Sequence, residues 1–147
     1  MKSPTSSGKG FAAAAAGLLA ACSATNAAPA AGGRTRLQRD VESYAVITCL
    51  GLQDQAYLKE QSGGWASNLL QRSKGGIEDF TPIGTAVQAE IAKGGMAMVI
   101  VESPPMTELL LPVQFCTEIV DKPGVRAAID AAAGRLAADY RRADADK

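Results

Sequence analysis

A chain of 147 residues has room for one folded domain, and its fifteen basic and fifteen acidic residues give a formal net charge of zero. This balance argues against a nucleic-acid-binding domain, which needs a basic surface. Histidine is absent, which removes the usual general base, the commonest metal ligand and any histidine-activated nucleophile. We therefore expect a protein that is not an enzyme and that has no catalytic residue, cofactor or metal site.

The first 21 residues have the composition of an export signal. Lys2 and Lys9 supply positive charge, and an apolar run follows at residues 11–21. This run is shorter than the ~20 residues that a helix needs to cross a bilayer core. It ends in the sequence LAAC, the lipobox pattern of bacterial lipoproteins, so we expect lipidation at Cys22. The alternative is an ordinary signal peptide cleaved after Ala27, which would discard this cysteine.

The lipobox also predicts a location and a domain organisation. Ser23 follows the cysteine, where an aspartate would indicate retention at the inner membrane, so we expect an outer-membrane anchor that faces the periplasm. Residues 22–39 are small, contain proline and glycine, and are typical of a flexible tether. Residues 40–143 are expected to form the folded domain, and residues 144–147 a frayed tail.

The strongest helical pattern lies at residues 40–58. Small and apolar residues recur there at spacings of three and four, which places them on one helix face, and Asp40 is a suitable N-cap. A turn at residues 59–64 and a short helix over residues 65–72 follow. The Thr-Pro pair at the start of residues 81–93 predicts another helix.

The segment 96–101 (MAMVIV) is compatible with a strand or with a helix. A single strand would lack a partner, so we expect a buried helical segment. Thr107 is then expected to cap a helix that Pro112 kinks or delays, with an inner side formed by Leu109, Leu110, Val113, Cys116 and Val120. A final alanine-rich helix is expected over residues 125–142. The fold class is therefore all-α, a small bundle of four to five helices.

Cys49 and Cys116 fall on the apolar sides of two predicted helices. In an exported protein such a pair is more often bonded than free, and closing the 67-residue separation would stabilise the fold by about 4 kcal/mol. Three cysteines then divide into one that is lipidated and two that are paired. The alternative is two buried free thiols that act as small apolar residues.

Two segments together resemble a known protein family. Residues 44–57 (YAVITCLGLQDQAY) form a tyrosine-containing helix around Cys49, and residues 109–129 (LLLPVQFCTEIVDKPGVRAAI) run from an apolar stretch through Cys116 and a turn into the last helix. They resemble the immunity proteins that protect bacteria from amidase effectors of the type VI secretion system. The likeness extends over residues 40–136. This chain departs from the family at Phe115, where a charged residue is frequent, at Pro112, and at residues 118–120, which lack the usual tyrosine.

The resemblance implies a periplasmic immunity protein that binds a cysteine-peptidase-type peptidoglycan amidase and occludes its active site, which protects the producing cell and its kin. It also implies a homodimer. Contact with a membrane would be made only through the lipid at Cys22, and nucleic acid is not an expected partner. A different reading is an accessory or structural lipoprotein that docks on an envelope complex.

Two places in the sequence are candidates for contact with the partner. The first is the proline-rigidified loop ESPPMT, which would lose little entropy on binding and whose residues are Glu102, Ser103, Pro104, Pro105, Met106 and Thr107. Its alternative is an ordinary connection between helices. The second is Trp65, of the residue type enriched at binding hot spots, although a single tryptophan is more often part of a core.

Overall fold

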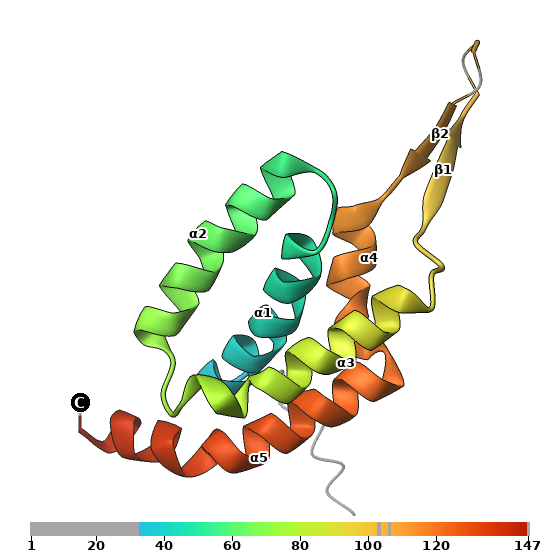
Figure 1. The fold of residues 1–147 in the computed structure, drawn as a ribbon. Helices are drawn as coiled ribbons and strands as arrows, with labels where there is room; N and C mark the ends of the chain where they lie inside the picture. The colour runs from blue at the N-terminus through green and yellow to red at the C-terminus, as the bar shows by residue number, and fades with distance from the viewer. Residues whose placement is uncertain (1–32, 103, 106, 147) are drawn as a thin grey trace, which may run out of the picture. The chain divides into compact units, whose positions relative to one another are not determined.

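The computed structural model describes residues 33–102, 104–105 and 107–146 of the chain. The expected signal segment, Cys22 and residues 22–32 of the expected tether lie outside these residues. The described part has this order: α1 (Arg36–Gly51), α2 (Ala56–Arg72), a 3-10 turn η1 (Ile77–Asp79), α3 (Thr81–Ala92), β1 (Met98–Val101), β2 (Thr107–Leu110), α4 (Pro112–Glu118), a 3-10 turn η2 (Ile119–Asp121) and α5 (Pro123–Ala145) (Figure 1). The prediction of a small, mostly helical bundle is confirmed, with one short hairpin added.

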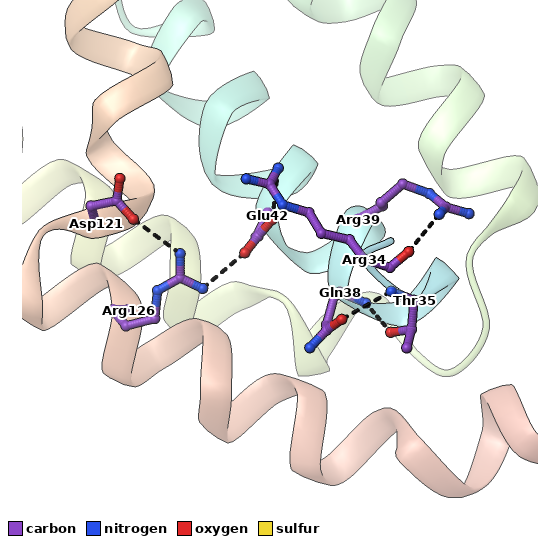
Figure 2. Close-up of polar contacts among 7 residues, drawn as sticks. All are labelled: Arg34, Thr35, Gln38, Arg39, Glu42, Asp121 and Arg126. Carbon is purple, nitrogen blue, oxygen red and sulfur yellow. Dashed lines mark hydrogen bonds and ion pairs between the residues drawn. The ribbon is translucent and has the colours of Figure 1, made fainter. Parts of the chain in front are cut away.

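Helix α1 begins earlier than the sequence pattern indicated. Thr35 and Gln38 form a capping box: the Thr35 hydroxyl accepts from the Gln38 backbone N–H at 3.1 Å, and the Gln38 side chain accepts from the Thr35 backbone N–H at 2.9 Å (Figure 2). The prediction that Asp40 is the N-cap is therefore wrong. Asp40 lies inside the helix, and its side chain is buried.

The long helix expected at residues 40–58 is interrupted after Gly51. The backbone N–H of Gln53 bonds to the carbonyl of Leu50, and the Gln53 side-chain amide donates to the Cys49 carbonyl at 2.9 Å. In a continuous helix the Gln53 backbone N–H would bond to the Cys49 carbonyl, and here the Gln53 side-chain amide takes its place. A Cβ at Gly51 would lie 2.9 Å from the Ser62 hydroxyl, so the absence of a side chain lets α1 and α2 approach closely here.

Helix α2 runs without a break through residues 59–64, where a turn was predicted. Two adjacent glycines weaken a helix by about 1 kcal/mol each relative to alanine, so local propensity argued for the turn. Packing overrides it, because Leu58, Ser62 and Leu69 of α2 are buried in the fold. Tertiary contact, which a single sequence does not display, decides this element.

Helix α1 is the centre of the bundle and contacts α2, α3, α4 and α5. Its buried face meets Phe80 and the core residues of α3 and α5, and the core contains Val41, Ala45, Cys49, Ile83, Val87, Val125, Ile129, Leu136 and Tyr140. Cys49 of α1 and Cys116 of α4 are fully buried and form the predicted disulfide, with 5.5 Å between their Cα atoms. The disulfide prediction is confirmed, and the alternative of two free thiols is wrong.

The predicted helix at residues 96–101 is wrong, because β1 occupies most of this segment. Its partner is β2, which begins at Thr107 where a helix cap was expected, so the two strands pair antiparallel on either side of the paired prolines. Helix α4 begins only at Pro112, a position that suits proline because the first helical residue needs no N–H partner. Strand β1 does have a partner, and that partner lies within the segment that was assigned to the next helix.

Candidate functional site

The hairpin strands β1 and β2 extend away from the helices (Figure 1). Met98 pairs with Leu110 and Val99 with Leu109, while Ile100 and Val101 pair with Glu108 and Thr107. Because side chains alternate along a strand, one face carries Met98, Ile100 and Leu110 and the other carries Val99, Val101 and Leu109. Every residue of both strands is exposed to solvent. The hairpin therefore presents apolar side chains on both of its faces.

Such exposure is unusual for a folded domain. Ile100 is 56% exposed, and Met98, Leu109, Leu110 and the neighbouring Val113 are about equally accessible. Contiguous apolar patches on soluble domains mark interaction sites, and a two-stranded hairpin is by itself only marginally stable in water. Both facts favour a partner that covers the hairpin.

The described residues of the predicted contact loop follow β1 and lead into β2, so this segment does not connect two helices. Glu102, Pro104 and Pro105 are exposed there, and the Thr107 hydroxyl donates to the Pro105 carbonyl at 3.0 Å. Ser103 and Met106 lie outside the described residues. Pro104 and Pro105 thus lie between two exposed apolar strands. This arrangement was not predicted, because both flanks were assigned to helices.

Trp65 lies on α2 and is 39% exposed, so the alternative that it belongs to the core is wrong. It lines a surface hollow of about 440 Å³, which we call the α1 groove and which has Arg34, Arg39, Glu42, Ser43, Val46, Thr117, Val120 and Asp121 as its other lining residues. None of these residues belongs to the hairpin. The two predicted contact regions therefore lie on separate surfaces.

Glu42 and Asp121 of the α1 groove form ion pairs with Arg34 and with Arg126, which is not itself a lining residue (Figure 2). Oε1 of Glu42 lies 2.9 Å from Nη1 of Arg126, and Oε2 of Glu42 lies 3.2 Å from Nη1 of Arg34. Arg126 also pairs with Asp121 at 3.4 Å. The hydrogen bond with Glu42 raises the pKa of Arg126, although partial burial acts in the opposite direction.

A second polar cluster, which the sequence analysis missed, is buried where α1, α2 and α5 meet. Oδ1 of Asp40 lies 2.9 Å from Nη2 of Arg72, and Oδ2 accepts a hydrogen bond from Tyr140. Burial, followed by this hydrogen bond, raises the pKa of Tyr140 well above its usual value. The only sign of this cluster in the sequence is that Asp40 stands next to an apolar helical stripe, and this aspartate was interpreted as a helix cap.

Neither a metal site nor a free thiol is found among the described residues. Within residues 33–146, apart from the two undescribed positions, no three His, Cys, Asp or Glu side chains are grouped so that they could hold a metal ion. Both cysteines of this part are bonded to each other, so neither is a free nucleophile. In the same residues, no helix combines the length and the apolar character needed to cross a membrane.

No protein-family model, curated protein or solved structure matches this chain. The resemblance of its two cysteine-containing segments to amidase immunity proteins therefore stays a hypothesis. A disulfide is typical of proteins in oxidising compartments, so the observed bond favours a location outside the cytoplasm. The hairpin and the α1 groove are the surfaces from which a function can be argued.

Proposed function

We propose that this protein is an immunity protein that inhibits a peptidoglycan amidase delivered by a type VI secretion system. The observation that carries the proposal is the exposed hairpin, whose two apolar faces and tip suit insertion into a cleft of another protein. An amidase that cuts peptide stems must have a groove for an extended chain. A hairpin that fills this groove excludes substrate without any catalytic group of its own.

The energetics of insertion are favourable because the contact side chains are already exposed. Completing the burial of one half-exposed Ile, Leu, Val or Met side chain contributes about 1 kcal/mol, so the hairpin side chains together offset part of the cost of association. The prolines at the tip restrict the free backbone and reduce the entropy lost on binding. The free edge of the hairpin also allows pairing with an extended segment of the partner.

The proposal includes a location and an assembly. The protein acts in the periplasm, is anchored to the outer membrane through a lipid at Cys22, and forms a homodimer. The Cys49–Cys116 disulfide supports the oxidising compartment, and the lipobox at residues 19–22 supports the anchor. The partner is a cysteine-peptidase-type amidase from the same bacterium or its kin.

The test combines capture with an inhibition assay. The exported protein is used to capture partners from periplasmic and secreted fractions, and any amidase recovered is purified and assayed for peptidoglycan digestion. We expect digestion to stop at equimolar protein. The variant Ile100→Lys should lose inhibition, whereas Leu70→Lys, which changes a side chain 51% exposed on α2, should keep it.

Two other results would contradict the proposal. Recovery of envelope-complex subunits, with no effect on digestion, would instead support the accessory lipoprotein. Equal inhibition by wild type and Ile100→Lys would show that the hairpin is not the inhibitory element, even if an amidase is bound.

A further inference from the structure

The charged side chains at the α1 groove carry one more positive than negative charge. Arg34 and Arg39 line the groove together with the carboxylates of Glu42 and Asp121, and Arg126, which is not a lining residue, forms ion pairs with both of these carboxylates. Both carboxylates are already engaged: Glu42 is shared by Arg34 and Arg126, and Asp121 binds the second nitrogen of Arg126.

Arg39 carries the third guanidinium group, which takes no part in these ion pairs. It turns back along the chain and donates to the backbone carbonyl of Arg34 at 2.6 Å (Figure 2). Among the described residues, no carboxylate forms an ion pair with it. A planar guanidinium with free donors is well suited to bind a carboxylate through two parallel hydrogen bonds.

Apolar groups lie beside this charge. Arg39, Ser43 and Val46 are four and three residues apart, so they share one face of α1, and Trp65 of α2 lines the same hollow. Val120 contributes a further apolar contact from η2. Tryptophan and arginine are the residue types most enriched at binding hot spots, and a volume of about 440 Å³ is within the range of small-ligand sites.

We propose that the α1 groove is a binding site for a peptide segment that carries a carboxylate next to an apolar side chain. The carboxylate of a Glu or Asp residue binds Arg39, and the adjacent apolar side chain packs on Trp65. One carboxylate balances the single excess positive charge of Arg34, Arg39 and Arg126 over Glu42 and Asp121, whereas a phosphate dianion would reverse the sign of the net charge. This site is separate from the hairpin and does not depend on the proposed amidase.

Trp65 provides a direct test because it is the only tryptophan in the chain. The full chain is titrated with acetyl-Leu-Glu-Leu-amide and with acetyl-Leu-Gln-Leu-amide, an uncharged peptide of the same shape. The fluorescence of Trp65 is recorded in both titrations. We expect a saturable change with the acidic peptide and a dissociation constant for it about tenfold lower than for the neutral peptide. The preference should weaken as salt is added, because the contact is exposed to solvent.

Two variants and a control identify the residue responsible. Arg39→Gln should abolish the preference for the acidic peptide. Arg39→Lys should retain only part of this preference, because an ammonium group cannot form the two parallel hydrogen bonds of a guanidinium group. Arg141→Gln removes an exposed arginine of α5 and should leave the preference unchanged. Unchanged circular dichroism shows that each variant is folded.

The proposal is overturned if the two peptides bind equally, if Arg39→Gln keeps the preference, or if the Trp65 fluorescence shows no saturable change up to ~20 mM peptide. No amidase is present in this experiment, so its failure leaves the inhibitory hairpin untouched. Failure of the amidase assay would likewise not contradict peptide binding in the α1 groove.

Discussion

The hydroxyl of Tyr140 donates a 2.8 Å hydrogen bond to Oδ2 of Asp40, across 100 residues of sequence. The same carboxylate binds Arg72 at the end of α2, and Arg36 lies 4.0 Å from it and 5.6 Å from the centre of the Tyr140 ring. One buried carboxylate therefore connects α1 with the last turn of α2 and with α5. This contact predicts how stability depends on pH and on charge.

Stability should fall in alkaline solution through Tyr140. Its pKa is raised in the folded state by burial and by Asp40, so above about pH 10 the unfolded chain loses the phenolic proton while the folded chain keeps it. The favourable contribution is complete below pH 10 and is lost as pH rises, at about 1.4 kcal/mol per pH unit.

Urea unfolding of wild type and Tyr140→Phe between pH 8 and pH 11.5 would measure this dependence. Tyr140→Phe has no phenolic proton to lose, so its free energy of unfolding should fall less with rising pH. The free energies of unfolding of the two proteins should therefore converge as pH rises. Parallel curves would show that Tyr140 titrates normally in the fold. Tyr57→Phe is the matched control, because Tyr57 is 67% exposed.

Removing the negative charge of Asp40 should be costly. Asp40→Asn keeps the shape of the side chain but removes the buried anion that Arg72 and Arg36 contact. Because the Arg72 side chain is itself 44% exposed, we expect a cost of about 2 kcal/mol, typical of hydrogen bonds to a charged group. Urea unfolding at pH 7 measures the difference. Asp54→Asn, at an exposed position, should change stability by less than about 0.5 kcal/mol. An equal effect of the two substitutions would contradict the assigned role of Asp40.

Helices α3 and α5 and the disulfide were predictable because their signals are local or compositional. Ile83 and Val87 stand four residues apart, as do Val125 and Ile129, and all four are buried. The hairpin was not predictable in the same way, since β1 is recognisable only through its pairing with β2. Asp40 was misread for a similar reason: its partners Arg72 and Tyr140 lie far away in sequence, so an N-cap was the only local explanation.

The candidate site was only partly predictable. Proline pairs signal a turn, so the loop at residues 102–107 could be found, and Trp65 stood out by its residue type. That both flanks of the loop are exposed apolar strands depends on the pairing of β1 with β2. That Trp65 shares a groove with Arg39 depends on the packing of α1 against α2. No spacing rule in the sequence contains this information.

The disulfide should carry a large share of the stability. Cys49→Ser removes a cross-link that joins α1 to α4 and should lower the free energy of unfolding of the oxidised protein by about 4 kcal/mol. Under reductant, wild type and variant should differ little. Thermal melting under both conditions gives the comparison, and equal melting temperatures of the oxidised proteins would show that the bond does not stabilise the fold.

The hairpin should contribute to binding much more than to stability. Val99→Lys and Ile100→Lys change side chains that are already exposed on opposite faces of β1, so each should alter the free energy of unfolding by less than about 0.5 kcal/mol. Val87→Ala, in the fully buried core of α3, should cost about 2 kcal/mol in the same urea experiment. A large loss of stability in either lysine variant would mean that the hairpin packs on the helices in solution. In that case its apolar side chains would not be free for a partner, and the inhibitory role proposed for the hairpin would have to be abandoned.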